Sequence, residues 1–77
     1  MILRLVGLPV EPGQVAEMER AFAMARPRIA ALPGCQQVSL LRTGEGEEPD
    51  FLTLSVWDGR DDLEEYRRSD LFREIWP

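Results

Sequence analysis

The chain has 77 residues, and its 14 acidic residues against nine arginines give a formal net charge of −5. This charge has the wrong sign for the counterion release that drives nucleic-acid binding, so we expect no nucleic-acid partner. A chain of this length forms a single domain over residues 1–77 that buries only roughly 60% of its unfolded surface, so a partner subunit would add stability.

Missing residue types restrict the chemistry further. The sequence contains no histidine, lysine or asparagine, and its only cysteine is Cys35. It therefore has no histidine-based triad, no lysine Schiff base, no histidine-ligated haem or metal, and no internal disulfide. We expect no bound cofactor and no metal, and the single thiol suits the reducing cytoplasm.

Membrane insertion and export are also not expected. The chain lacks the run of about 18 apolar residues that would span a bilayer. Residues 1–10 contain Gly7 and Pro9 and have neither a basic region nor a cleavage site. We interpret the chain as a soluble, cytoplasmic protein without a membrane partner.

The first half of the chain predicts a strand followed by one long helix. Residues 2–8 are apolar at nearly every position, which is typical of a short buried strand. Pro12 suits the first turn of a helix, where a missing N–H costs nothing. Apolar residues then recur at spacings of three and four, which predicts a helix over about residues 14–31, bent at Pro27. This helix face consists of Val15, Met18, Phe22, Ala25, Ile29 and Leu32.

The second half predicts a hairpin and a broken helix. Pro33 and Gly34 end the first helix, and residues 35–42 and 51–57 alternate as strands. The acidic, glycine-containing loop at 43–50 between them is interpreted as a solvated turn. Asp61 or Asp62 would cap a second helix, and Ser69 would restart it. The side chains of this part that we expect to pack are Leu63, Tyr66, Leu71, Phe72, Ile75 and Trp76.

The order of elements predicts an α+β fold, β-α-β-β-α, with both helices on one face of an antiparallel sheet. The expected core combines the first helix with Val38, Leu40, Leu52, Leu54 and Val56. The second sheet face would then hold Gln37, Ser39, Leu41, Phe51, Thr53, Ser55 and Trp57, joined by either Arg4 or the Leu3 and Leu5 pair. Such a half-polar face is typical of a pocket or a wet interface with a second copy, although a solvated sheet face is the alternative.

An ordered set of residues spanning nearly the whole chain resembles the antibiotic biosynthesis monooxygenase-like (ABM) domains of the dimeric α+β barrel group. The set comprises the strand leading into Glu11-Pro12-Gly13, Pro27 followed by Leu32-Pro33-Gly34-Cys35, and Trp57, Leu63, Tyr66, Ser69, Leu71, Phe72 and Trp76. The resemblance implies a ferredoxin-like fold in which two subunits join sheet to sheet as a homodimer. It also implies a ligand cavity between the sheet and its helices or inside the barrel.

Three departures from this family's pattern bear on the fold and the chemistry. The family usually has a fourth strand after the second helix, and this chain ends at Pro77, so we expect a three-stranded sheet with an open edge. Quinone-forming members have an asparagine four residues before the tryptophan, where this chain has Thr53 before Trp57. Haem-degrading members need a histidine that is absent here.

The best catalytic candidates are Trp57 and Tyr66. Trp57 would stack on an aromatic substrate or, alternatively, pack in the subunit interface. Tyr66 would donate a proton or hydrogen bond, or else be a partly buried core residue. Arg4, if it points into the barrel, must find a carboxylate or an anionic ligand. Cys35 has no neighbouring base to activate it, so a nucleophilic role is not expected.

Two functions follow from these residues and the resemblance. The first is a homodimeric ABM-like protein that binds, and would oxidise, a small aromatic or quinone-like molecule without metal or haem. The alternative is a non-catalytic small-molecule-binding or assembly module of the same barrel type, which the shortage of proton-transfer groups favours.

Overall fold

A computed structural model describes residues 1–43 and 50–76 of the protein. The elements follow the predicted order, with β1 at Ile2–Leu8, α1 at Val15–Ala30, β2 at Cys35–Thr43, β3 at Asp50–Trp57, α2 at Arg60–Arg68 and α3 at Asp70–Ile75. A 3₁₀ turn at Pro12–Gln14 leads into α1. Of the loop predicted at 43–50, residues 44–49 lie outside the described residues, whereas Thr43 and Asp50 belong to the strands.

The structure confirms the predicted boundaries of the first helix to within about one residue, whereas the second helix begins earlier than predicted. Helix α1 continues through Pro27, and Gly34 follows its end with a φ of 80°, a value that favours glycine. Helix α2 is capped by Gly59 and not by Asp61 or Asp62, which lie in its first turn and favour the positive end of its dipole. Ser69 restarts the helix as predicted, because its hydroxyl accepts a hydrogen bond from the Phe72 N–H at 3.1 Å.

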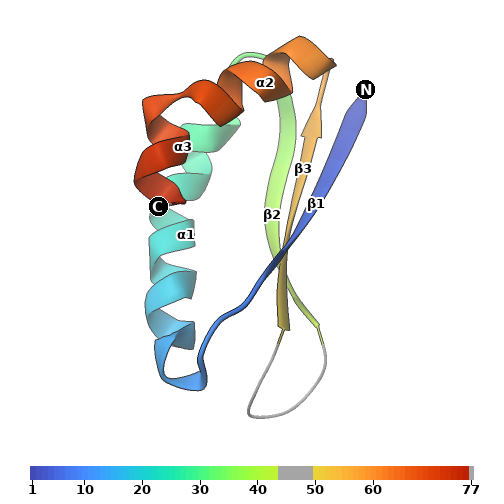
Figure 1. Ribbon diagram of the computed structural model, residues 1–77. Helices are drawn as coiled ribbons and strands as arrows, with labels where there is room; N and C mark the ends of the chain where they lie inside the picture. Colours follow the sequence, from blue (N-terminus) through green and yellow to red (C-terminus); the bar gives the residue numbers. More distant parts are fainter. Residues whose placement is uncertain (44–49, 77) are drawn as a thin grey trace.

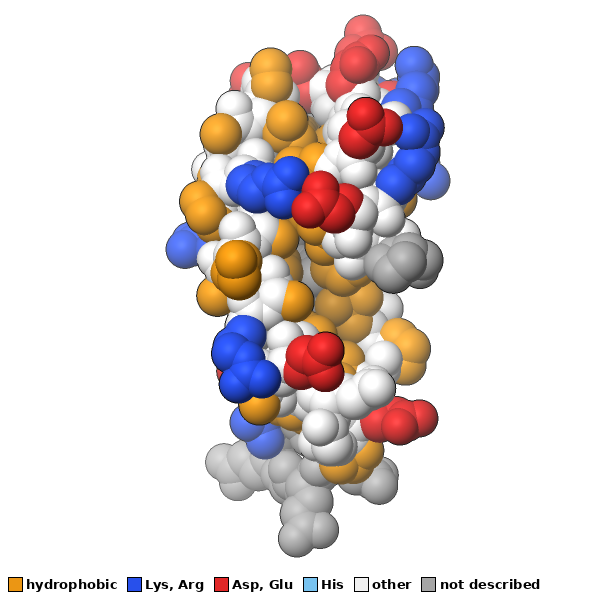
Figure 2. All heavy atoms as spheres, turned by 90° about the vertical axis from the view of Figure 1, so that its left-hand side faces the viewer, with side chains coloured by type: hydrophobic (Ala, Val, Ile, Leu, Met, Phe, Trp, Pro, Cys, Tyr) orange, Lys and Arg blue, Asp and Glu red, His pale blue; other side chains and the backbone are white. Residues whose placement is uncertain are grey.

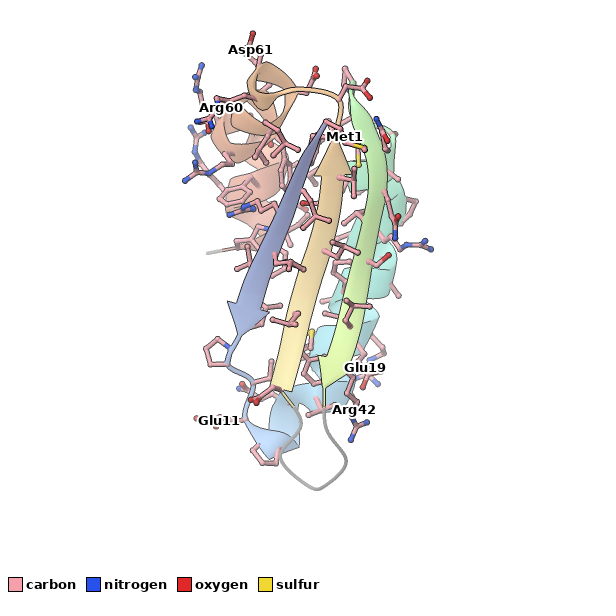
Figure 3. The ribbon with its side chains drawn as sticks, turned by 90° about the vertical axis from the view of Figure 1, so that its right-hand side faces the viewer. Met1, Glu11, Glu19, Arg42, Arg60 and Asp61 are labelled. Carbon is pink, nitrogen blue, oxygen red and sulfur yellow. The ribbon has the colours of Figure 1, made fainter. Side chains whose placement is uncertain are left out.

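The described sheet has three antiparallel strands in the order β1-β3-β2, so β3 is central and no fourth strand is present among the described residues. Helix α1 packs along β2, and α2 lies across the end of the sheet where β3 finishes (Figure 1). All helices therefore cover one face of the sheet, in a ferredoxin-like arrangement. Viewed from the other side, the strands lie in front and the helices behind them (Figure 3).

The register of the hairpin places the alternate residues of β3 on the opposite faces from those we predicted. Val38 pairs with Ser55 and Leu40 pairs with Thr53, and directly paired residues of antiparallel strands point to the same side. The helix-covered face therefore receives the buried residues Phe51, Thr53, Ser55 and Trp57. The predicted placement of Leu52, Leu54 and Val56 in the core is wrong, because both faces of β3 are apolar enough for alternation alone to be ambiguous.

Burial of the aromatic side chains of β3 explains why this orientation of the strand is favoured over the predicted one. Trp57 is 0% exposed and Phe51 2% exposed, so turning β3 this way removes its two largest apolar side chains from water. The buried cluster at the centre of the core consists of Phe22, Ala25, Ile29, Val38, Trp57 and Tyr66. The core thus forms between α1, the sheet and α2, with Tyr66 as the main contribution of α2.

The open face of the sheet, the side without helices, is correspondingly more apolar than predicted. Strand pairing places on it Leu3, Leu5, Gly7, Gln37, Ser39, Leu41, Leu52, Leu54 and Val56. Leu3 is 58% exposed and Leu5 56% exposed, so the leucine pair and not Arg4 joins this face. No helix among the described residues is both long and apolar enough to cross a membrane.

Candidate functional site

The two catalytic candidates lie in direct contact within one aromatic cluster, formed by Trp57, Tyr66, Phe72 and Trp76. The Trp57 and Tyr66 rings stack with centroids 5.0 Å apart, and Phe72 meets Tyr66 edge to face at 5.1 Å. Trp76 donates its indole Nε1–H to the Tyr66 hydroxyl oxygen at 2.9 Å. Strand β3 supplies Trp57, α2 supplies Tyr66, and the restart of the helix at Ser69 brings Phe72 and Trp76 to them.

Tyr66 is held as a neutral phenol. Burial raises its pKa, while the hydrogen bond from Trp76 and the positive charge of Arg4 act in the opposite direction. The hydroxyl oxygen accepts from Trp76, and its own proton has no acceptor among the described residues. Tyr66 therefore keeps a free hydrogen-bond donor, although its side chain is buried and is not among the lining residues of the pocket described below.

Trp57 is positioned to support Tyr66 and does not line an open cavity. Its side chain is fully buried, and its Nε1–H has no hydrogen-bond partner among the described residues. A buried donor left unpaired costs about 1–3 kcal/mol, which stacking and apolar burial must offset. Trp57 thus contacts the helix layer through the stacked Tyr66 ring.

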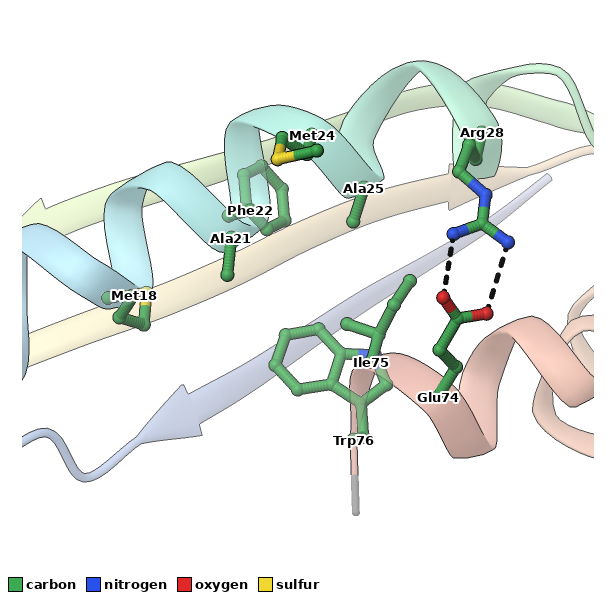
Figure 4. Close-up of a pocket in the computed structure, with 9 residues that line it drawn as sticks. All are labelled: Met18, Ala21, Phe22, Met24, Ala25, Arg28, Glu74, Ile75 and Trp76. Carbon is green, nitrogen blue, oxygen red and sulfur yellow. Dashed lines mark hydrogen bonds and ion pairs between the residues drawn. The ribbon is translucent and has the colours of Figure 1, made fainter.

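A pocket of about 330 Å³, here called the α1/α3 groove, lies between the two helices on the outer side of the cluster. Figure 2 shows this apolar hollow in the helix layer, and Figure 4 shows the indole of Trp76 facing Phe22 and Ala21 across it. Its size falls within the range of small-molecule sites. The groove is lined by Met18, Ala21, Phe22, Met24, Ala25, Arg28, Glu74, Ile75 and Trp76.

An ion pair joins the two walls at one end of the groove. Arg28 Nη1 and Nη2 donate to Glu74 Oε1 and Oε2 at 3.0 and 3.1 Å (Figure 4). The guanidinium holds the pKa of Glu74 below its usual range, and the carboxylate raises that of Arg28. Because both side chains are exposed, the pair links α1 to α3 but adds little stability.

The predicted lining residues divide between the two faces of the sheet. Gln37, Ser39 and Leu41 lie on the open face as expected, with the Gln37 amide donating to Ser39 Oγ at 3.3 Å. The other five predicted lining residues lie on the helix-covered face, spread along it from Trp57 at one end of β3 to Phe51 at the other. They are Arg4, Phe51, Thr53, Ser55 and Trp57.

Cys35 is placed opposite Trp57 at the start of β2, where a bulge separates it from Gln37. Burial raises the pKa of its thiol, which keeps it protonated and poorly nucleophilic. No group of three metal-ligating side chains comes together within residues 1–43 and 50–76.

Sequence reasoning missed the groove itself. Its α1 wall uses the predicted apolar face of the helix, including Met18, Phe22 and Ala25, which we assigned wholly to the core. Trp76 was expected only to pack. The available signal was the width of the apolar face of α1, which is larger than the sheet can cover. Helix α1 packs on β2 with one part of this face, and the other part is left to contact α3.

Solved structures with this fold place the chain among known proteins. Three that carry the name antibiotic biosynthesis monooxygenase superpose well. The protein from Nitrosomonas europaea has a TM-score of 0.85 at 15% identity, covering 97% of this chain and 78% of its own. The protein from Caulobacter crescentus has a TM-score of 0.82 at 26% identity, and the match covers 95% of this chain and 68% of that one. The protein from Bordetella bronchiseptica has a TM-score of 0.78 at 30% identity, and the match covers 95% of this chain and 74% of that one.

No curated protein matches the chain significantly. The sequence model of the antibiotic biosynthesis monooxygenase family, however, matches residues 1–76, which is essentially the whole domain. Together with the fold shared with the three solved structures, this match shows that the chain belongs to the antibiotic biosynthesis monooxygenase (ABM) family.

Proposed function

We propose that this protein binds a small aromatic or quinone-like molecule in the α1/α3 groove and oxidises it without metal or haem. The observation that carries the proposal is the contact of Trp76 with both the groove and Tyr66. Trp76 lines the groove, and its N–H holds the Tyr66 hydroxyl whose proton remains available. An apolar pocket with few polar groups favours an aromatic ligand.

The reaction that suits this family is oxidation of a phenol to a quinone by O₂. One oxygen atom of O₂ becomes the new carbonyl, and the other leaves as water with the ring hydrogen and the phenolic hydrogen. Tyr66 donates a hydrogen bond to the substrate oxygen, where negative charge develops. The apolar walls of the groove orient the aromatic ring.

A binding titration followed by a turnover assay tests this function. We expect 1-naphthol to bind the wild-type protein in calorimetry and Ala21→Trp, which fills the groove, to abolish binding. Ala16→Trp, an exposed position on the same helix outside the groove lining, should leave it unchanged. Equal affinity in both variants would place the ligand elsewhere.

Turnover is measured as oxygen uptake together with quinone absorbance. Tyr66→Phe should lower the rate about 10²-fold or more if the hydroxyl stabilises charge in the transition state. Trp57→Phe, which keeps a stacked ring, should lower it less. Binding of several phenols without any oxygen uptake would instead support a non-catalytic binding module, which the replacement of the family's asparagine by Thr53 favours.

We also propose that the open face joins a second copy of the chain in the cytoplasm. Leu3, Leu5 and Leu41 are exposed on it, and together with Leu52 and Leu54 they form a contiguous apolar surface. Charge at its centre, as in Leu54→Glu, should convert a dimer to a monomer in sedimentation. Ala23→Glu, an exposed helix position, is the control. A wild-type monomer at micromolar concentration overturns this part.

A further inference from the structure

Arg4 lies on the helix-covered face of the sheet without a carboxylate to neutralise it. It is half-buried on β1, and its Cζ lies 5.7 Å from the centroid of the Phe72 ring. No acidic side chain forms an ion pair with it among the described residues. Contact with one aromatic ring compensates only part of the lost hydration of a guanidinium.

The acidic residues of the helix opposite Arg4 are already paired with other arginines. Asp70 accepts from Arg73 at 2.9 Å, and Glu74 accepts from Arg28. Helix α3 therefore presents to Arg4 the ring of Phe72 and not a carboxylate. The positive charge remains available for an anion from outside the chain.

The groups around Arg4 are hydroxyls that can assist an anion. Ser55 is its direct partner across β3, and Thr53 follows on the same face. Both residues are buried, at 6% and 9% exposure, and neither hydroxyl has a hydrogen-bond partner among the described residues. Tyr66, whose pKa Arg4 influences, adds a third hydroxyl. One cation and three hydroxyl donors thus surround one region.

The end of the chain that contacts Arg4 also supplies one wall of the α1/α3 groove. Ile75 and Trp76 lie three and four residues after Phe72, which places both beside it on the same side. Phe72 contacts Arg4, whereas Ile75 and Trp76 line the groove, and Figure 4 shows β1 passing behind it. A ligand with its ring against Trp76 can therefore extend its polar end toward Arg4.

We propose that Arg4, with Ser55 and Thr53, binds the carboxylate of the ligand, so that the preferred ligand is an acidic aromatic molecule. This inference rests on the proposed function, because it names the class of molecule that the same groove takes. An ion pair with Arg adds directional hydrogen bonds that a neutral phenol does not make. Arg4 is thus a specificity residue, and the aromatic body is bound by the groove.

The test compares two ligands of the same shape, 2-naphthoate and its neutral amide, 2-naphthamide, by calorimetry. We expect the wild-type protein to bind the naphthoate about tenfold or more tightly. Arg4→Met should remove this preference and leave the affinity for naphthamide unchanged. Arg4→Lys, which keeps the charge, should retain part of it. Arg20→Met, an exposed arginine on α1, should behave as wild type.

The outcomes separate this inference from the function beneath it. Equal affinity of wild type for the two ligands, or a preference that survives in Arg4→Met, overturns the carboxylate site and leaves the aromatic site standing. Failure of both ligands to bind overturns both. If Arg4→Met does not fold by circular dichroism, Arg4→Lys becomes the test, and a preference for naphthoate over naphthamide as large as that of wild type has the same consequence.

Discussion

The Trp76 indole N–H donates to the Tyr66 hydroxyl oxygen at 2.9 Å, and this bond joins α3 to α2 at the centre of the aromatic cluster. The last helical segment is only six residues long, too short to be stable by itself. Its position depends on the Ser69 cap, on Phe72 and Trp76 packing against Tyr66, and on the Arg28 to Glu74 ion pair. Helix α3 forms one wall of the groove, so this wall keeps its position only while these contacts are intact.

Removing the acceptor of this bond should destabilise the protein. Tyr66→Phe leaves the Trp76 N–H without its partner, and we expect a loss of about 1–3 kcal/mol in urea unfolding. In a double-mutant cycle with Trp76→Phe, the two losses should couple by about 0.5–1.5 kcal/mol. Strictly additive losses would mean that the hydrogen bond contributes nothing to stability.

Tyr66 is the single tyrosine of the chain, so tyrosinate absorbance reports on it alone. Burial raises its folded-state pKa, so the unfolded protein loses this proton at lower pH than the folded one. Stability should be constant below the ordinary tyrosine pKa and fall as pH rises from there through the raised folded pKa. Tyr66→Phe should remove this alkaline loss.

The same titration checks the influence of Arg4. Because the positive charge of Arg4 lowers the pKa of Tyr66 against the larger effect of burial, Arg4→Met should move the titration to still higher pH. Arg20→Met, on an exposed position of α1, should leave it unchanged. A titration at the ordinary tyrosine pKa in the folded wild type would contradict the buried placement of Tyr66.

The ion pair across the groove should respond to acid and salt. Arg28 lowers the folded-state pKa of Glu74, so the stabilisation is present above the ordinary glutamate pKa and is lost as pH falls through the lowered one. Glu74→Gln should therefore be slightly less stable than wild type at neutral pH and equal to it in strong acid. High salt should shrink the difference, since both groups are exposed. A difference that persists in acid would point to another cause.

Gly34 should tolerate no side chain. Its φ of 80° is strained for other residues, and a Cβ there would collide with the side chain of Asp62. We expect Gly34→Ala to lower the free energy of unfolding by at least about 1–2 kcal/mol. Gly13→Ala is the matched control, because a Cβ at Gly13 meets nothing within 4 Å. Adding Asp62→Gly, compared with Asp62→Gly alone, removes both the carboxyl group and the Cβ of Asp62 that a Cβ at Gly34 would meet, and it should recover the part due to collision. The same loss without recovery would assign the effect to backbone strain alone.

The sequence by itself determined the order and the boundaries of the elements. The three-and-four spacing from Val15 to Ile29 predicted α1, and Pro33 and Gly34 marked its end. Ser69 predicted the restart of the helix, because capping is a local interaction that needs only neighbouring residues. Residue content also restricted the chemistry, since the absence of histidine and lysine does not depend on the fold.

Only the tertiary structure decided which face of β3 meets the helices. Alternation allowed either the leucines or Trp57 and its neighbours to face inward, and the choice came from pairing Val38 with Ser55 and from stacking Trp57 on Tyr66. These contacts join residues far apart in sequence, and their energy is not visible in any local pattern. The strand pairing also decided the position of Arg4, which the sequence had left open, by placing it on the helix-covered face against Phe72 of α3.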